Sequence, residues 1–219
     1  MDGILQVADL GRRAYGPVLA LQEQLVAARQ RDERPDTLLC VEHTPVYTLG
    51  RTANRAHILL PPDELQRRGI EVFEIGRGGD VTYHGPGQLV VYPILKLDGA
   101  ERRVLWYVGC LEQTIVRVLA DYGIAATLDR QNRGVWVGDA KIAALGVRIT
   151  RHVTMHGFAL NVAVELGYYA GIVPCGIADR GVTSLNRFVP GVTLADAQSR
   201  VRERFMQVFG YTDWEPAAL

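Results

Sequence analysis

The chain has 219 residues, of which 48% are hydrophobic and 22% are charged, and these values are typical of a protein with a sizeable apolar core. Lys plus Arg and Asp plus Glu each total 24, so the formal net charge is zero, which argues against a broad nucleic-acid or membrane-surface binder. No apolar stretch approaches the roughly 20 residues that a membrane-spanning helix needs, and the first residues, MDGILQVADLGRRAYG, lack the pattern of a secretory signal.

The first half of the chain predicts two helices and three strands. A helix is predicted over about 15–31 from an imperfect apolar stripe made by Leu19, Leu21, Leu25, Val26 and Ala28. Strands are predicted at the apolar runs 37–42, 70–75 and 88–95. A second helix is predicted over about 104–122, where apolar residues recur at i, i+4, i+7 and i+11, and Gly123 follows as a natural stop.

The second half of the chain predicts three more strands and a final helix. The strands are expected at 133–137, 140–149 and 157–164. The helix is expected from Thr193 to about Phe209, with Asp196 placed to complement its N-terminus. Runs of adjacent strands interrupted by two or three helices indicate an α+β fold with a mixed, largely antiparallel sheet flanked by helices. No repeat, low-complexity segment or long linker divides the chain, so residues 1–219 are expected to form a single domain.

A glycine-rich segment at 76–88, GRGGDVTYHGPGQ, is the first candidate site and has five glycines in 13 positions. Such glycine density indicates backbone in conformations closed to other residues, or backbone pressed against a ligand. The segment matches neither the phosphate-binding loop GxxxxGK[ST] nor the dinucleotide-binding pattern GxGxxG. An elaborate hairpin connection is the alternative, but the segment carries more polar function than a turn requires, in Arg77, Thr82, Tyr83 and His84.

Lys141 is the second candidate, because 22 of the 24 basic residues are Arg and only Lys96 and Lys141 are Lys. A retained Lys indicates a use for a proton that a guanidinium does not release. In a strand over 140–149, Lys141 shares a face with four apolar residues. Its ammonium is then either partly desolvated, which lowers its pKa unless an anion is near, or it reaches water at the strand end. Lys96 is interpreted as a surface residue.

The strand predicted at 157–164 has one face of larger apolar side chains and one face of small ones. The small face carries Gly157, Ala159, Asn161 and Ala163. With Ala144 and Gly146 on the preceding strand, this face leaves room either for a slender apolar ligand or for a closely packed helix.

Cys175 is the third candidate, because it lies in the loop sequence GIVPCG, whereas Cys40 and Cys110 have the contexts of small core residues. A loop thiol is reactive only where a cation or a helix N-terminus stabilises its thiolate, and an inert thiol is the alternative. Three cysteines leave one unpaired under any disulfide scheme, and they lack the CxxC spacing of a zinc site. We therefore expect reduced thiols and a cytoplasmic protein.

No metal site is predicted. His152 and His156 have the i, i+4 spacing of a helical metal pair, but their segment, RHVTMHG, is typical of a strand or turn. No third ligand is evident in the sequence.

Four stretches together resemble one family. They are RGGDVTYHGPGQLVVYP at 77–93, GVWVGDAKIAALG at 134–146, HGFALNV at 156–162 and PCG at 174–176. Their order and spacing, including the 34 residues from Lys141 to Cys175, are similar to those of the lipoyl(octanoyl) transferase family, the octanoyltransferases of lipoate biosynthesis. The match extends over about 100 residues. One departure is Tyr169, where the family commonly has Phe, and this exchange bears on pocket polarity.

The resemblance implies a biotin/lipoate protein ligase-like catalytic domain that takes an octanoyl group from octanoyl-acyl carrier protein. The acceptors would be lysines on lipoyl domains of 2-oxoacid dehydrogenase E2 subunits and on the glycine cleavage H protein. It implies that Cys175 is the nucleophile and that Lys141 lowers its pKa. No cofactor, nucleic acid or membrane is implied, and we expect a monomer. The implied substrate-binding residues are Arg77, Gly78, Gly79, Asp80, Val81, Thr82, Tyr83, His84, Ala144, Leu145, Gly146, Gly157, Phe158 and Ala159.

Two other functions are compatible with the sequence. An ATP-dependent lipoate or biotin ligase of the same fold would bind an adenylate and would need neither the PCG sequence nor the spacing from Lys141 to Cys175. A non-catalytic acyl-binding module would bind fatty-acyl groups without transferring them.

Overall fold

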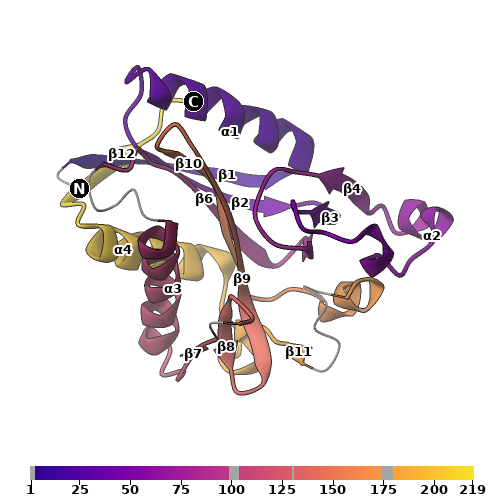
Figure 1. Cartoon of the computed structure of the whole chain (residues 1–219). Helices are drawn as coiled ribbons and strands as arrows, with labels where there is room; N and C mark the ends of the chain where they lie inside the picture. Colours follow the sequence, from indigo (N-terminus) through magenta and orange to yellow (C-terminus); the bar gives the residue numbers. More distant parts are fainter. Residues whose placement is uncertain (1–2, 99–103, 130, 174–179) are drawn as a thin grey trace.

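The computed structural model describes residues 3–98, 104–129, 131–173 and 180–219, and these residues form a nine-stranded sheet and a three-stranded sheet (Figure 1). Strands β1 and β12 at one end of the large sheet are parallel to their neighbours, whereas β2, β6, β10, β9, β8 and β7 pair antiparallel in that order. β11 pairs with β9 in parallel. The strands are β1 (Ile4–Arg13), β2 (Thr37–His43), β6 (Gln88–Ile94), β7 (Thr127–Leu128), β8 (Val135–Val137), β9 (Ala140–Thr150), β10 (Val153–Asn161), β11 (Gly181–Val182) and β12 (Asp213–Pro216).

The small sheet corrects the description of the glycine-rich segment as a connection between strands. It has the order β4 (Glu71–Glu74), β3 (Val46–Leu49) and β5 (Val81–His84), so a strand lies inside 76–88. Val81 and Tyr83 alternate inward and are fully buried. The alternation of buried and less buried residues extends over only four residues, and glycines lie close on both sides. The strand was therefore not recognised in the glycine-rich sequence.

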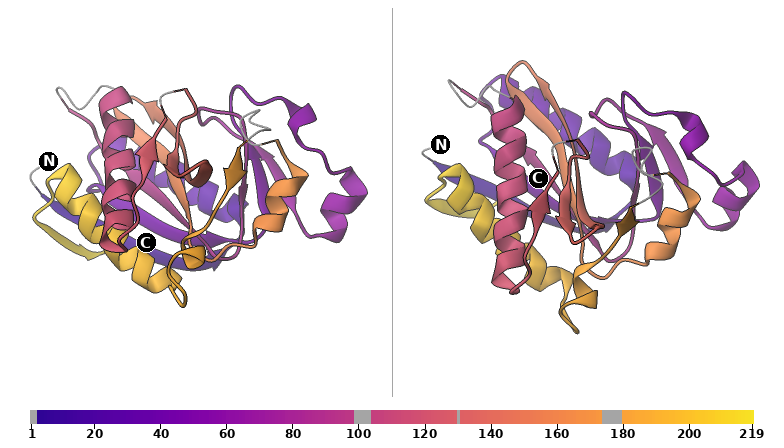
Figure 2. Two further views of the ribbon diagram at one scale, coloured as in Figure 1. Left: turned by 90° about the horizontal axis from the view of Figure 1, so that it is seen from below. Right: turned by 60° about the horizontal axis from the view of Figure 1, so that its bottom comes forward.

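Helices cover both faces of the large sheet (Figures 1 and 2). α1 (Tyr15–Gln30) packs on one face, and α3 (Val104–Asp121) and α4 (Leu194–Phe209) pack on the other. The short α2 (Pro62–Arg67) lies beside the small sheet. The main core lies between α3, α4 and the sheet, where side chains such as Leu111, Ile115 and Phe205 are fully buried. Within the described ranges, no helix is both long and apolar enough to cross a membrane.

The predicted α+β class, the three long helices and the main strands are confirmed. Thr193 caps α4 by accepting a hydrogen bond from the Asp196 N–H, and Gly210, at φ +80°, ends the helix. One boundary prediction was wrong: β10 spans Val153–Asn161 instead of 157–164.

The long β10 contains a local break opposite Pro93. The register that pairs Phe158 with Val91 also pairs Val153 with Lys96, so Pro93, which has no N–H, falls opposite His156. His156 has φ +60°, and its N–H donates to Gln22 Oε1 of α1 at 3.0 Å. The break therefore attaches α1 to the centre of the sheet.

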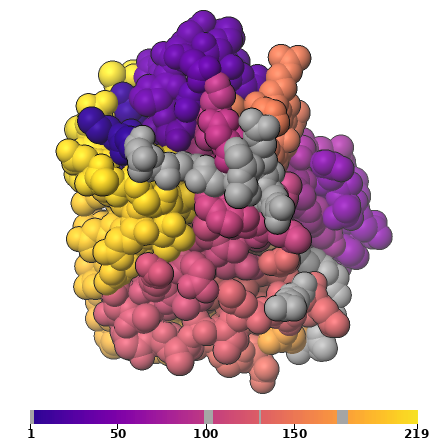
Figure 3. Space-filling model, turned by 60° about the vertical axis from the view of Figure 1, so that its left-hand side comes forward, coloured from indigo at the N-terminus to yellow at the C-terminus, as the bar shows by residue number. Residues whose placement is uncertain are grey.

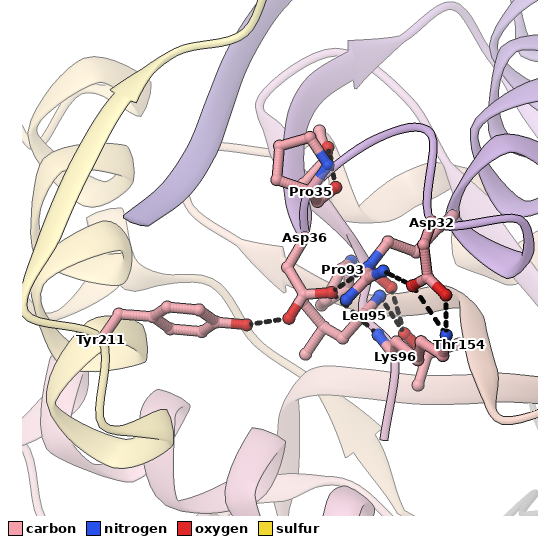
Figure 4. Close-up of polar contacts among 10 residues, drawn as sticks. Asp32, Pro35, Asp36, Pro93, Leu95, Lys96, Thr154 and Tyr211 are labelled. Carbon is pink, nitrogen blue, oxygen red and sulfur yellow. Dashed lines mark hydrogen bonds and ion pairs between the residues drawn. The ribbon is translucent and has the colours of Figure 1, made fainter. Parts of the chain in front are cut away.

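A polar cluster around Asp36 joins four segments at the opposite end of α1 from Tyr15 (Figure 4). One carboxylate oxygen of Asp36 accepts from Arg29 Nε at 2.7 Å and from the Lys96 N–H at 2.9 Å. The other accepts from the Tyr211 hydroxyl at 2.7 Å. The cluster links α1, β2 and the end of β6 to the segment after α4, and none of its residues lines the cavity described next.

Candidate active site

A cavity lies between the start of α1, the glycine-rich segment and the adjoining strands β6, β10 and β9. The space enclosed by its lining is about 530 Å³, including the part that is open to solvent. The small face predicted from the sequence forms one wall, since Ala144, Gly146, Gly157 and Ala159 all line it. α1 packs on the neighbouring part of the same face. The sequence left open whether this face would adjoin a ligand space or a packed helix, and in the structure it adjoins both.

Most residues predicted to bind substrate line this cavity. They are Arg77, Gly79, Asp80, Val81, Thr82, His84, Ala144, Leu145, Gly146, Gly157, Phe158 and Ala159, together with Lys141. Gly78 instead lines an adjoining groove. Tyr83 packs on the other side of β5, where its ring stacks on Tyr168 at 4.9 Å between centroids. Cys175 lies outside the described residues.

Arg77 brings a buried cation to the cavity. One terminal nitrogen donates to the Thr48 carbonyl at 2.6 Å and to the Thr48 hydroxyl at 2.9 Å, and the other donates to the Gly78 carbonyl at 3.0 Å. Its side chain passes over Gly146, where a Cβ atom would lie 2.7 Å from Arg77 Cδ. Glycine at 146 therefore allows the guanidinium stem to lie against β9.

Lys141 is buried, with 8% of its surface exposed, so its ammonium does not extend into water from the strand end. Nζ donates to the Arg133 carbonyl at 3.0 Å and lies 4.9 Å from the centre of the Trp136 ring. The stem runs beside Gly134, which has φ +145° and where a Cβ atom would lie 2.9 Å from Lys141 Cε. Gly134 has a conformation that other residues rarely adopt, and its missing side chain leaves room for the lysine stem beside the cavity.

Two neutral histidines, His84 and His156, line the cavity, and a third, His43, lies beside His84. Burial lowers the pKa of His84 to about 3, with a further contribution from neighbouring His43, and burial lowers the pKa values of His43 and His156 to about 4. His43 donates through Nδ1 to the Arg13 carbonyl, so its Nε2 accepts from the Tyr92 hydroxyl at 2.9 Å. At neutral pH these rings act as hydrogen-bonding and packing groups and carry no charge.

Tyr169, the departure from the family pattern, has its hydroxyl in a buried polar network. The hydroxyl accepts from Gln88 Nε2 at 3.0 Å and donates to Asn161 Oδ1 at 3.2 Å. Gln88 Oε1 in turn accepts from His84 Nδ1 at 2.8 Å. The extra hydroxyl is therefore accommodated by amide partners next to the cavity.

The structure adds five lining residues that the sequence did not select: Tyr15, Val90, Tyr92, Arg133 and His156. Val90, Tyr92 and His156 lie inside the stretches that resemble the family, and Arg133 directly precedes one of these stretches. The position of these four residues in or beside the motifs could have identified them. Nothing in the sequence indicated that Tyr15 would line the cavity, because it lies far from these stretches in the chain. In the part of the chain that the structure describes, no three His, Cys, Asp or Glu side chains are grouped to hold a metal ion.

The sequence of the chain is similar to that of one known protein family. Residues 14–206 match the model of the lipoyl protein ligase A/B catalytic domain. An octanoyltransferase of Gloeobacter violaceus is 49% identical over 199 residues, covering 90% of this chain and 86% of that protein. An octanoyltransferase of Alkaliphilus metalliredigens is 46% identical over 209 residues, covering 94% and 96%.

A solved structure has the same fold. The bipartite lipoate protein ligase of Thermoplasma acidophilum, described with its E2 lipoyl domain, superimposes with a TM-score of 0.76 and 17% identity, covering 99% of this chain and 87% of that one. The predicted lipoate ligase-like fold is thereby confirmed. The chain belongs to the lipoyl protein ligase A/B catalytic domain family.

Proposed function

We propose that this chain is an octanoyltransferase that moves an octanoyl group from octanoyl-acyl carrier protein to the lysine of a lipoyl domain through a thioester on Cys175. The observation that carries the proposal is identity of up to 49% to octanoyltransferases over nearly the whole chain, joined to a buried Lys141 at an apolar cavity. The acceptors would be E2 lipoyl domains and the glycine cleavage H protein. A lipoyl domain accompanies the related ligase of T. acidophilum.

The cavity suits a slender acyl chain. Four small residues of the sheet, Ala144, Gly146, Gly157 and Ala159, leave depth in its wall. The lining also carries four charged residues, Arg77, Asp80, Arg133 and Lys141. An eight-carbon chain on the sheet wall would exclude water from the lysine and strengthen its electrostatic interactions.

The other cysteines are poor nucleophile candidates. Cys40 is fully buried in the sheet, and burial raises the pKa of its thiol to about 12. Cys110 lies on α3 against the main core. Neither lines the cavity, which supports the assignment of the acyl group to Cys175.

Transfer requires two displacements. The Cys175 thiolate attacks the carbonyl carbon of the donor thioester, a new C–S bond forms, and the donor leaves as its thiolate. The acceptor amine then attacks the same carbonyl carbon, a C–N bond forms, and the bond to Cys175 sulfur breaks. The first step exchanges thioesters and is nearly thermoneutral, whereas amide formation is downhill, so ATP is not required.

Lys141 would serve both steps. As an ammonium it stabilises the Cys175 thiolate, because a free thiol with a pKa of about 8.5 is only a few per cent ionised at pH 7. Once the thiol is acylated that negative charge is gone, and the buried lysine releases its proton more readily. It then accepts the proton that the incoming amine loses.

The catalytic domain is proposed to extend over residues 1–219. The family match covers residues 14–206, but β1 and β12 add to the same sheet beside β2. The segments outside the matched region thus continue one hydrogen-bonded layer.

A transfer assay tests the function. Purified protein, octanoyl-carrier protein and a lipoyl domain are mixed without ATP, and the mass of the lipoyl domain is followed. The proposal predicts one added octanoyl group at a rate that ATP does not change. In a parallel mixture, free octanoate replaces octanoyl-carrier protein, because a ligase adenylates a carboxylate and not a thioester. Transfer that occurs only in that mixture, needs ATP and releases pyrophosphate would establish a ligase, and acyl binding without transfer would establish a binding module.

A further inference from the structure

A surface groove adjoins the cavity at Lys141. Cavity and groove share six lining residues: Gly79, Asp80, Arg133, Lys141, Leu145 and Gly146. The groove encloses about 1310 Å³, including the part open to solvent, which is more than twice the volume of the cavity. It therefore forms an approach to the lysine that is separate from the space for the acyl chain.

One side of the groove is an open edge of β9. The Gly78 N–H donates to the Val147 carbonyl at 3.0 Å, so Val147 directs its backbone groups away from β10. Strand alternation directs the N–H and carbonyl of Leu145 to the same edge. β8 pairs with this edge only as far as Ala143, and none of the other described strands continues it. Leu145 thus presents one donor and one acceptor to the groove.

The other side of the groove is apolar. Val104 and Leu105 in the first turn of α3 are 52% and 72% exposed, high values for large apolar side chains, and both line the groove with Val108. α3 lies at the surface between α4 and the segment of β8 and β9 (Figure 3). The combination of an amide-pairing edge and an apolar wall fits a thin chain that carries both amides and methyl groups.

We infer that this groove holds the pantetheine-type arm, a thin chain with secondary amides, through which the octanoyl thioester is attached to its donor. The inference rests on the proposed function and specifies its donor site. The arm must pass from the surface to the thioester beside Lys141, and the groove is continuous with that point. An amide of the arm pairs with Leu145 as an added strand would, and its methyl-bearing part lies on Val104 and Leu105.

The acceptor fits this groove less well. A lysine side chain brings a four-carbon stem and an amine to the reacting carbon, with no amide to pair with Leu145. We therefore assign the groove to the donor, and the experiment below separates the two.

Leu105→Gln tests the apolar wall, because it keeps helix propensity and adds no charge. Leu59→Gln is the matched control, since Leu59 is 57% exposed and lines neither cavity nor groove. Transfer is measured from octanoyl-pantetheine and from the truncated octanoyl-N-acetylcysteamine thioester. Leu105→Gln is expected to raise KM for the pantetheine donor about three- to tenfold and to leave KM for the truncated donor and for the lipoyl domain unchanged.

A second arm of the experiment tests the β9 edge with the unmodified protein. Methylating both amide nitrogens of octanoyl-pantetheine is expected to raise KM about tenfold, because the donors to the edge are lost. The inference is overturned if Leu105→Gln alters KM for both donors equally, for the lipoyl domain alone or for neither, or if methylation has no effect. Failure of the unmodified protein to transfer from any donor would instead refute the proposed function.

Discussion

Lys141 depends on two neighbouring backbone features. Its Nζ donates to the Arg133 carbonyl, and its stem occupies the space that the absence of a side chain at Gly134 leaves. A carbonyl oxygen carries no net charge, so this hydrogen bond orients the Lys141 amine without forming an ion pair. The proposed proton transfer would account for a lysine at position 141, because arginine supplies charge but does not release a proton at neutral pH.

Lys141→Arg is therefore expected to reduce kcat by about a hundredfold or more, the usual contribution of a general acid or base. The matched control is Lys96→Arg, because the other lysine is paired with Asp32 at the surface. Steady-state transfer to a lipoyl domain measures both variants, and thermal unfolding confirms that they are folded. Turnover of Lys141→Arg at the unmodified rate would refute the proton-transfer role.

Several residues of the cavity could be predicted from the sequence, because residues of their type are unusual in the segments that contain them. Lys141 is a rare lysine on an apolar strand, and Arg77 lies among glycines. His156 was named from the sequence but considered only as a metal ligand. Its place in the cavity follows from the break opposite Pro93, a contact between strands that local sequence patterns do not reveal.

At the scale of the elements, the hydrogen bonds of Asp36 are expected to contribute to the free energy of unfolding (Figure 4). One carboxylate accepts from Arg29, from the Lys96 N–H and from Tyr211, so a single side chain holds α1, the end of β6 and the segment after α4 together. Removing one partner of such a partly buried charged network leaves the others without their bonds.

Asp36→Asn is expected to lower the free energy of unfolding by about 2–4 kcal/mol. Tyr211→Phe removes one hydrogen bond and is expected to cost about 1 kcal/mol. Urea denaturation measures both. Because no residue of the cluster lines the cavity, kcat of the folded variants is expected to equal that of the unmodified protein, and a large fall in kcat would contradict this separation.

The helices and the long strands were predictable because their apolar periodicity extends over many residues, as in α3 and α4. β1 was not predicted, since the second half of Ile4–Arg13 is mostly exposed and polar. β12 consists of exposed residues paired only at the sheet edge. Such short or edge strands are fixed by long-range pairing, which the local sequence does not encode.

The whole molecule assembles its site from segments far apart in sequence. Tyr15, the glycine-rich segment, β9 and β10 meet because β6 and β10 pair at the centre of the large sheet and α1 packs on the same face. The motifs predicted most of the residues that line the cavity, but the cavity and the groove exist only once the strands pair.

The buried histidines make the stability of the whole molecule depend on pH. In the folded state the pKa values of His43 and His156 are lowered to about 4, and that of His84 to about 3, from about 6.5 in the unfolded chain. The unfolded chain therefore binds more protons below pH 6.5. The free energy of unfolding therefore keeps its full value above pH 6.5. It decreases as the pH falls towards 4, by up to about 1.4 kcal/mol per pH unit for each histidine.

Urea unfolding between pH 7 and 4.5 tests this dependence. His43→Gln is expected to reduce the slope of unfolding free energy against pH by about 1.4 kcal/mol per pH unit. His152 lies on the exposed turn between β9 and β10, and His152→Gln is the control for loss of a histidine from the surface. An unchanged slope in His43→Gln would mean that the buried ring is protonated in the folded state.

The most direct test of the transfer mechanism is intact-protein mass spectrometry after the enzyme is mixed with octanoyl-carrier protein in the absence of ATP, followed by peptide mapping. Our account predicts one octanoyl adduct on Cys175 that disappears, with gain of the same mass on the acceptor, when a lipoyl domain is added. Folded protein with reduced Cys175 and no adduct, or an adduct confined to Cys40 or Cys110, would contradict it.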